Sequence, residues 1–357
     1  MRISVNFAAV PDMTPERASW LAHSHHLRAF ALLAGFHRNP VGGTHRVLVD
    51  VATEAADFPV PAVTAGTWPA VGGCLNRAWG TELAMCAGRQ YAAEDELLRV
   101  MNSWAAVQSY YVAYHVAQAL IVAEGGTRPT THPATQKQYV DLWVARAARL
   151  NPWTFAVGSQ QDRRCAPDGM ADGPGRPLTN VHAWHAATPA NAWEHAEQAL
   201  RSTRGAAYDE RCAKARQEKA RERQKEWTEQ WAHQPNRRKP DWWTRRPNLD
   251  AATKARIEKG TRPYTLLDYL YRLRVKANYE DARVYTSGPA NQGEAQALND
   301  DLALLASATA IVHEVRIAQL VGAKTFLHEA EQWAARNAPT ETNFGLPARL
   351  KVLRSVL

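Results

Sequence analysis

Arg274, Asn278 and Asp281 are the residues whose types and spacing most directly suggest chemistry. They recur at i, i+4 and i+7, so on a helix they lie along one face, beside Tyr271. A guanidinium can stabilise negative charge that develops on a phosphate, and a carboxylate can orient that guanidinium. The spacing therefore predicts a phosphate clamp in which Asp281 positions Arg274. The alternative is an ion pair on the helix surface, or a network that stabilises helix packing.

Histidine is the residue type that most readily moves protons near neutral pH, and the chain has 13 of them. His115 lies within an apolar helical stretch, where it is either a catalytic base or a core residue with satisfied nitrogens. Arg176 and His182 are six positions apart, in a segment with the composition of a loop. His313 could approach Arg274 if the two helices that carry them pack antiparallel. Three histidines near the N-terminus are expected to decorate a helix surface: His23, His25 and His26.

The sequence carries no clear signature of a metal or cofactor site. His182 and His185 could share a helical face, but no third ligand has a convincing spacing. The four cysteines are dispersed without a CxxC pair, which argues against a zinc ribbon and a disulfide framework and favours a reducing cytoplasm. No Walker loop, GxGxxG, HExxH or GxSxG motif occurs, so the chemistry of those motifs is not favoured. We expect no metal and no other cofactor.

The positive charge of the protein is concentrated in one segment. The chain has 43 Lys and Arg against 35 Asp and Glu, a net charge of +8. Residues 201–262 hold 18 Lys and Arg and 9 Asp and Glu, a net of +9, so the remainder nets −1. A local basic segment is typical of nucleic-acid binders; the alternative is a solvated helix rich in ion pairs. The residues expected to contact nucleic acid are Arg211, Arg216, Lys219, Arg223, Arg237, Arg238, Lys239 and Trp242.

Four tryptophans interleave with the basic residues of this segment: Trp227, Trp231, Trp242 and Trp243. Aromatic side chains next to cations can stack on bases while the charges hold phosphates. The alternative, equally compatible with the sequence, is that these tryptophans pin the basic segment to the body of the protein or to a second subunit.

The elements that position these residues are expected to be helices. Apolar residues at helical spacing predict helices over 14–35, 91–123, 134–149, 189–233, 264–285, 293–321, 324–336 and 346–356. Residues 36–90 are rich in Gly and Pro and are expected to be irregular, with a short strand at 47–51. Almost no large apolar residue occurs between Arg211 and Glu226, so this stretch should project into solvent. Residues 234–263 are expected to form an extended basic connector.

Two of these helices carry motifs that resemble a known superfamily. Residues 109–120, with the sequence SYYVAYHVAQAL, resemble the YYAxxHAxxAL first helix of HEPN domains. Residues 128–132, RPTTH, resemble the turn that follows that helix. Residues 270–281, LYRLRVKANYED, are similar to the RxxADY element, and residues 302–322 are similar to the final helix. The resemblance covers residues 95–150 and 262–323.

The resemblance implies an all-α, HEPN-like four- or five-helix bundle with an N-terminal extension and a long charged helical insertion. The implied division is an extension at 1–90, the two halves of the bundle at 91–150 and 263–323, the basic insertion at 151–262 and a helical tail at 324–357. Residues 95–123 should then pack against 264–285 and 293–321.

No apolar run approaches the length of a membrane helix, and the N-terminus lacks the apolar core of a secretory signal.

The resemblance also implies chemistry. Many HEPN proteins are metal-independent ribonucleases that use an Arg, a polar residue and a His, with dimerisation bringing two motifs together. Here Arg274 is present, while Asn278 and Tyr279 stand where the His would be sought, and a tyrosine with an ordinary pKa of about 10 is a poor base. In the enzyme version, Arg274 stabilises the phosphate while Asn278 and Tyr279 position it, and His115 is a further catalytic candidate.

The leading hypothesis is therefore a cytoplasmic HEPN-like protein that binds RNA in preference to DNA, as a homodimer and without contact to a membrane. Its expected activity is metal-independent RNA cleavage in a toxin or antiphage-type defence role. The alternative is a non-catalytic HEPN-like module, or a helical scaffold, that binds nucleic acid or a partner protein.

Overall fold

Two long helices, α4 (Asp95–Ala123) and α10 (Gln292–Val321), run through the centre of the molecule. Every residue from 301 to 318 of α10 is buried, as are most residues of the second half of α4. Both helices are rich in alanine, which lets neighbouring helices approach closely. The computed structural model describes residues 13–36, 43–61, 66–91, 94–146, 148–158, 170–171, 185–234, 237–280, 282–339 and 342–357.

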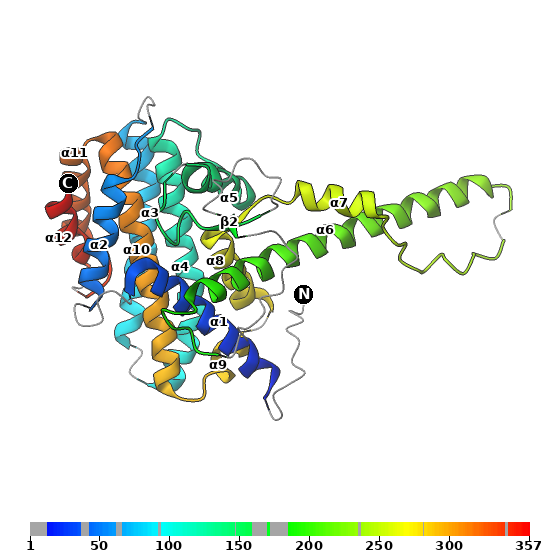
Figure 1. Ribbon diagram of the computed structural model, residues 1–357, viewed down its shortest axis with the longest axis horizontal. Coiled ribbons are helices and arrows are strands. Elements are labelled where there is room, and N and C mark those ends of the chain that lie inside the picture. The colour runs from blue at the N-terminus through cyan, green and yellow to red at the C-terminus, as the bar shows by residue number, and fades with distance from the viewer. Residues whose placement is uncertain are drawn as a thin grey trace.

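Helix α4 packs against α3 (Trp68–Tyr91), α10 and α8 (Leu266–Val275), as the apolar faces of residues 95–123, 264–285 and 293–321 predict. Helix α10 also contacts α2 (Gly43–Asp57) and α11 (Ala323–Asn337), and α12 (Leu346–Val356) packs against α2 and α11. Figure 1 shows α2, α10, α3 and α4 lying side by side. The protein is thus predominantly helical, which confirms the expected all-α class.

The N-terminal helix follows its sequence signals closely. Helix α1 (Pro15–Ala31) begins after Thr14, whose hydroxyl accepts a hydrogen bond from the backbone N–H of Arg17. It continues into the π turn η1 (Leu32–Phe36), where Gly35 adopts a φ of 99° that favours glycine. His23 and His26 are buried on this helix, so the expectation that these two histidines decorate a helix surface is wrong.

Residues 43–91, expected to be irregular, form the two helices α2 and α3 instead. In α2 the buried residues Val47, Leu48, Val51, Ala52 and Ala55 make a helical face, so the expected strand at 47–51 is wrong. The glycines of α3 do not break the helix; Gly88 leaves room for the side chain of Met101 on α4. Helices α1, α2 and α3 contribute to the same hydrophobic core as α4 and α10.

A charged network lies inside this core. The guanidinium of Arg349 on α12 is fully buried and pairs with Glu82 of α3 and Glu314 of α10. The indole N–H of Trp79 donates to Glu314 at 2.8 Å, and the hydroxyl of Ser307 donates to Glu82 at 2.8 Å. The network therefore ties three helices together where a carboxylate without partners would be very costly.

Short elements complete the body. Helix α5 (His132–Tyr139) continues into the π turn η2 (Val140–Val144), and α8 is followed by the π turn η4 (Lys276–Glu280) and by α9 (Arg283–Ser287). The expected single helix over 264–285 is therefore interrupted. Three two-residue strands, β1 (Ala156–Val157), β2 (Met170–Ala171) and β3 (Tyr264–Thr265), form a sheet in the order β2-β1-β3. Strand β1 is parallel to β2 and antiparallel to β3.

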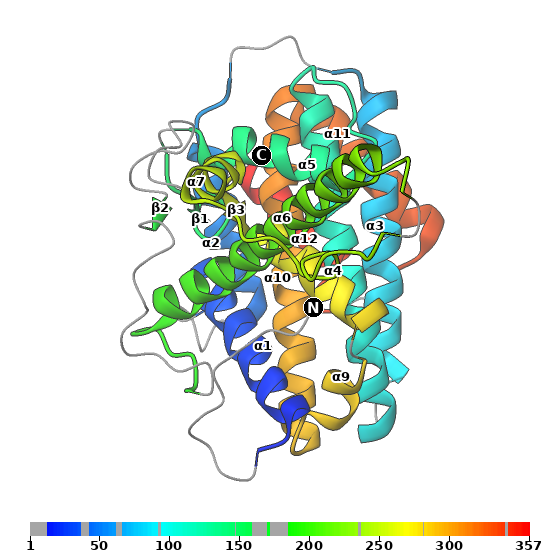
Figure 2. The same cartoon turned by 90° about the vertical axis from the view of Figure 1, so that its right-hand side faces the viewer.

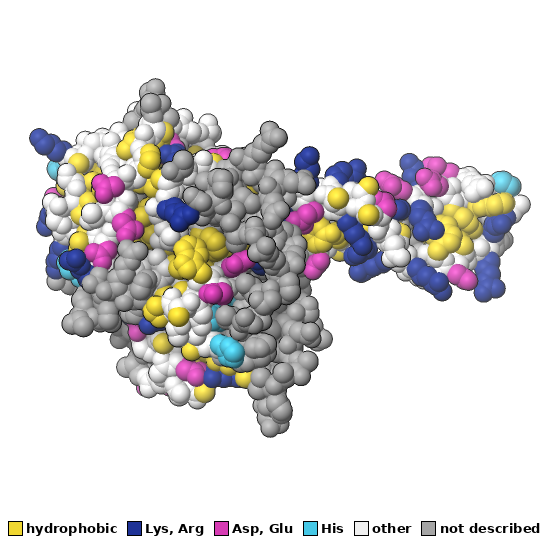
Figure 3. All heavy atoms as spheres, in the orientation of Figure 1, with side chains coloured by type: hydrophobic (Ala, Val, Ile, Leu, Met, Phe, Trp, Pro, Cys, Tyr) yellow, Lys and Arg dark blue, Asp and Glu magenta, His cyan; other side chains and the backbone are white. Residues whose placement is uncertain are grey.

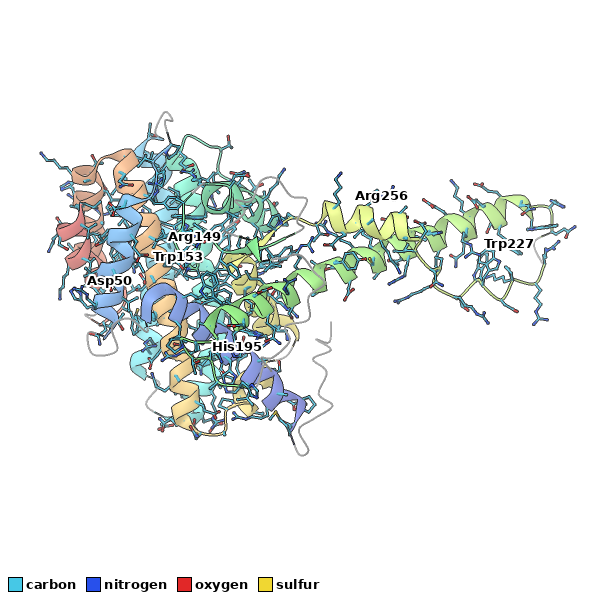
Figure 4. The ribbon with its side chains drawn as sticks, in the orientation of Figure 1. Asp50, Arg149, Trp153, His195, Trp227 and Arg256 are labelled. Atoms are coloured by element: carbon cyan, nitrogen blue, oxygen red, sulfur yellow. The ribbon has the colours of Figure 1, made fainter. Side chains whose placement is uncertain are left out.

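Helix α6 (Ala192–Gln230) carries a projection that we call the arm, residues 205–262. The arm comprises the outer part of α6, a return segment (residues 231–234 and 237–250) and α7 (Ala251–Gly260). It extends away from the body in Figure 1, and Figure 2 views it from its outer end. The expected helix at 189–233 and its projection into solvent are observed, whereas the expected connector at 234–263 contains α7. In Figure 4, His195 lies where α6 crosses the body, Arg256 lies on α7, and Trp227 lies toward the far end.

Candidate functional site

Arg274 lies in the last turn of α8, half-buried among tyrosines of α4 and α8. Its guanidinium carbon is 5.9, 5.2 and 5.6 Å from the ring centroids of Tyr110, Tyr111 and Tyr271. An aromatic face attracts a cation at these distances, so the three rings hold the guanidinium in place. The rings thereby position the cation of a residue that is partly exposed, although its Nε is buried.

His132, the first residue of α5, belongs to the same cluster. Its ring centroid is 4.7 Å from that of Tyr114 and 5.3 Å from that of Tyr271. Its Nδ1 lies 2.7 Å from the hydroxyl oxygen of Tyr110. His132 is not among the residues that the sequence predicts to be catalytic. It ends the RPTTH turn that resembles a HEPN element, and this resemblance is the sequence signal that could have indicated a functional role for it.

His115, a predicted catalytic residue, lies on the other side of Tyr111. The two rings are stacked, with centroids 5.9 Å apart and an interplanar angle of 24°. The ring of Tyr111 is also 6.2 Å from that of His132. Tyr111 therefore stands between one guanidinium and two imidazoles. We call these four residues, Arg274, Tyr111, His115 and His132, the Arg–His site.

Hydrogen bonds around Gln118 fix the proton of His115. The amide Nε2 of Gln118 donates to the hydroxyl of Tyr114 at 3.0 Å and to the carbonyl of Pro129 at 2.6 Å. Its Oε1 therefore faces Nδ1 of His115, 3.4 Å away, and must accept from it. This arrangement leaves Nε2 of His115 with a lone pair that can accept a proton.

The two imidazoles are neutral near pH 7. Burial lowers the pKa of His115 to about 4, and the pKa of His132 is lowered first by burial and then by the charge of Arg274. Burial raises the pKa of Tyr110, so its hydroxyl stays protonated and can donate to Nδ1 of His132. The proton of neutral His132 is then on Nε2. The site thus offers one proton acceptor, one N–H donor and one permanent cation.

Only part of the predicted clamp on α8 lies among the described residues. The α-helix ends at Val275, so Asn278 follows Arg274 through a π turn, where it is exposed. The continuous helical face assumed for residues 274–281 is therefore wrong. The side chain of Tyr279, and Asp281 as a whole, lie outside the described residues.

The other histidine candidates lie elsewhere. His313 is buried in the core, where its Nδ1 donates to the carbonyl of Thr309 at 2.7 Å and its Nε2 accepts from the indole of Trp143 at 3.1 Å. Burial lowers the pKa of His313 to about 3, so it is a satisfied core residue. Arg176 and His182 lie outside the described residues. Within the described part of the chain, no three His, Cys, Asp or Glu side chains form a group that could hold a metal ion.

The predicted nucleic-acid contacts all lie on the arm, but several also hold the arm together. Arg211 donates to the carbonyl of Gly260 at 2.6 Å, and Lys219 donates to that of Asn248 at 3.5 Å. Arg223 lies over the ring of Trp242, with 4.4 Å between its guanidinium carbon and the ring centroid. Two further contacts of this kind occur on the arm. The guanidinium carbon of Arg237 lies 3.3 Å from the ring centroid of Trp231, and Nζ of Lys239 lies 4.8 Å from that of Trp243.

The tryptophans form a small cluster at the outer end of the arm. Trp227 and Trp243 pack edge to face with centroids 5.3 Å apart, and Gln224 donates to the carbonyl of Trp243 at 2.7 Å. The cluster holds the return segment against α6. The described contacts therefore favour a packing role for the tryptophans, and the surface against which they pack belongs to the arm. Lys and Arg side chains remain on the arm surface (Figure 3), among them the exposed Arg238 and the half-buried Arg216.

A cavity of about 190 Å³ lies at the root of the arm, where α6 leaves the body. It lies between α5, α6 and α8, and Tyr271, which contacts both Arg274 and His132, forms one wall. A larger cavity, about 640 Å³, lies between α1, α3 and α10. It contains none of the predicted catalytic or nucleic-acid-binding residues, and its charges pair with one another, as in Arg28 with Asp301 and Arg89 with Asp300.

Comparisons with protein-family models, curated proteins and solved structures find no match to this chain. Among the described helices, α10 alone is long and apolar enough to span a membrane, and most of its apolar stretch is buried in the bundle. Such burial is typical of the central helix of a packed core.

Proposed function

We propose that the protein is a HEPN-like, metal-independent endoribonuclease that binds RNA along its arm and cleaves it at the Arg–His site. The observation that carries this proposal is the arrangement of His115, His132 and Arg274 around the half-exposed ring of Tyr111. RNA cleavage needs a base for the 2′-hydroxyl and donors for the phosphate, and these three residues supply them.

The proposed reaction is a transesterification within the RNA strand. Nε2 of His115 takes the proton of the 2′-hydroxyl, and the 2′-oxygen attacks the adjacent phosphorus. Arg274 and the Nε2–H of His132 donate to the non-bridging oxygens as their charge grows. The bond from phosphorus to the 5′-oxygen then breaks, the 5′-oxygen takes a proton from water, and a 2′,3′-cyclic phosphate remains.

The test is cleavage of labelled RNA in EDTA. Replacing Arg274 with alanine should lower the cleavage rate by about 10²- to 10³-fold, the effect of losing one donor to a developing oxyanion. Arg274→Lys should not restore the full rate, because lysine lacks the planar fork. The exposed Arg283 of α9 provides the matched control, Arg283→Ala. Circular dichroism must show that each variant is folded.

Two further results would contradict the proposal. Equal cleavage by wild type and a folded Arg274→Ala variant would remove Arg274 from the site. Cleavage of an otherwise identical strand with a 2′-deoxy sugar at the cut position would exclude attack by the 2′-hydroxyl. The rate should also rise with pH through the lowered pKa of His115, about 4, and then level off as this base loses its proton.

One observation favours a second function, a non-catalytic module that binds a partner protein or a second copy of the chain. Leu97, Val100 and Trp104 recur on one side of α4 and are 39, 44 and 56% exposed. Exposed apolar residues at helical spacing are typical of protein contacts. Replacing all three with serine should abolish self-association in analytical ultracentrifugation if this face joins two copies.

A further inference from the structure

The cavity at the root of the arm has the size of a site for one planar group. Its volume, about 190 Å³, is below the range of roughly 300–1,000 Å³ that is usual for larger ligands. Its lining comes from Gln136 of α5, from Thr203, Ala206, Ala207 and Glu210 of α6, and from residues 264–275. It therefore lies where the basic arm leaves the body.

The walls of the cavity suit an aromatic ring. Tyr264 and Tyr271 line it together with the apolar side chains of Ala206, Ala207 and Val275. Proteins that recognise single-stranded RNA commonly stack unpaired bases on tyrosines in this way. A nucleobase is the planar group that the proposed substrate would supply.

The polar groups at the cavity discriminate between the bases. Asp268 is already held by Arg262 and by the backbone N–H of Thr265, so its carboxylate is committed. Glu210 is exposed, and Lys214, four residues further along α6, pairs with Glu218 at 4.0 Å. The carboxylate of Glu210 can therefore accept hydrogen bonds from a ligand.

Guanine fits this set of groups better than the other bases. It alone presents two parallel N–H donors on its Watson–Crick edge, which a carboxylate accepts as a pair. Its O6 and N7 accept hydrogen bonds from arginine, and Arg272 lines the same cavity. Arg272 is oriented by the hydroxyl of Ser202, to which it donates at 3.1 Å.

Tyr271 connects this cavity to the Arg–His site. Its ring is 5.3 Å from that of His132 and 5.6 Å from the guanidinium carbon of Arg274. A base stacked on one side of Tyr271 would thus carry its phosphate toward Arg274. We propose that the cavity bounded by Tyr264, Tyr271, Glu210 and Arg272 binds a guanine base of the RNA, an inference that rests on the proposed RNA-binding function.

The experiment measures binding without cleavage. Four fluorescently labelled 2′-O-methyl pentanucleotides, uridine except for a central G, A, C or U, are titrated with the full chain, and anisotropy gives each Kd. The central-G strand should bind about tenfold more tightly than the other three, the effect of one hydrogen bond to a charged group. Glu210→Gln should remove this preference, because an amide oxygen cannot accept both N–H groups as a carboxylate does.

The control is Glu218→Gln, a change of the same kind on the same helix at a residue that does not line the cavity. It should keep the guanine preference. Equal affinity of wild type for the four strands, no binding of any strand, or an unchanged preference in Glu210→Gln would each overturn the inference. A guanine preference without cleavage of unmodified RNA would support the cavity and refute the ribonuclease, whereas cleavage without a base preference would do the reverse.

Discussion

The bundle and the arm are built from helices of similar regularity but are stabilised in different ways. In the bundle, α10 buries most of its side chains against six neighbouring helices: α1, α2, α3, α4, α11 and α12. In α6 the buried residues end at Cys212, and the remaining turns are held by local contacts. At the root, Arg204 pairs with Glu258 at 2.6 Å, and at the outer end the tryptophans pin the return segment. Helical shape alone therefore does not reveal what stabilises a helix.

The comparison also separates two kinds of charge. The bundle buries its charges in closed networks such as that of Arg349, where removal of one partner leaves another without compensation. The arm keeps many of its charges at the surface, where each contributes little to stability and is accessible to a ligand. Variants in the bundle should thus affect folding, and variants of exposed arm residues should affect binding.

The largest expected effect is acid destabilisation of the bundle. The pKa of His26 and that of His313 are lowered by burial to about 3, and that of His195 to about 4. Because these folded-state values lie below the unfolded value of about 6.5, their contribution is complete above pH 6.5 and is lost as the pH falls. Between pH 6.5 and 5 each histidine should cost up to about 2 kcal/mol.

Asp301 opposes this trend, since burial raises its pKa to about 6 and its contribution to stability grows as the pH falls toward 4. The stabilisation that Asp301 gains on acidification offsets the loss from about one histidine. The free energy of unfolding should therefore still fall steeply as the pH falls. Urea unfolding at pH 7.5, 6.5 and 5.5 measures it. A free energy of unfolding that is constant over this range would contradict the buried, neutral histidines.

The second effect concerns Arg349. Arg349→Ala leaves Glu82 and Glu314 buried without their cation and should lower the free energy of unfolding by about 3–5 kcal/mol. Arg354→Ala on the same helix is the control, because Arg354 pairs with Glu331 at the surface and should contribute about 0–1 kcal/mol. If urea unfolding gave similar losses of unfolding free energy for the two variants, the proposed difference between buried and surface charges would be contradicted.

The third effect should be confined to the arm. Trp243→Ala removes the contact with Trp227 and should release the return segment, while the stability of the bundle changes by less than about 0.5 kcal/mol. Limited trypsin digestion should then cut faster after Arg237 or Arg238. Trp193→Ala, at an exposed tryptophan near the start of α6, should leave these cuts unchanged. A loss of bundle stability in Trp243→Ala would show that the two regions are coupled.

The smallest effect per residue concerns the exposed charges of the arm. Replacing Arg238, Arg245, Arg246 and Arg256 with glutamine should flatten the salt dependence of RNA binding. The slope of log K against log salt should change by about 0.7–0.9 for each phosphate that the variant no longer neutralises. These four are better probes than Arg211, Lys219 and Arg223, whose changes would also loosen the arm.

The matched control removes the same charge from the bundle, at Arg283, Lys324, Arg336 and Lys351, all exposed. Binding measured across a salt series should lose slope only in the arm variant. Equal slopes in both variants would indicate that net charge, and not the arm, attracts the RNA.

Most helices can be predicted from the sequence because their signals are local. Thr14 caps α1, and the apolar spacing of α4 and α10 marks their faces. Helices α2 and α3 escape prediction because their glycines suggest turns, whereas Gly88 instead permits close packing against Met101. Close packing between two helices is a tertiary contact, and no pattern in a single sequence predicts it.

The same distinction explains the candidate site. Arg274 and His115 can be selected by motif, but His132 joins them only because α5 folds back over α4. The break of α8 at Val275 is also invisible in the sequence, since KANYE has no residue that ends a helix. Likewise His26 packs against His195 of α6 and His23 against Tyr269 of α8, which their spacing alone does not reveal.

The stiffness of α6 gives the arm a length scale. From Glu210 at the cavity to Gln230 near the tryptophans, 20 residues at 1.5 Å each span about 30 Å. An RNA long enough to reach both ends would be a bivalent ligand, since binding at one end raises its effective concentration at the other. Short strands would sense only the root of the arm, so this single helix would work as a ruler that makes affinity depend on the length of the RNA.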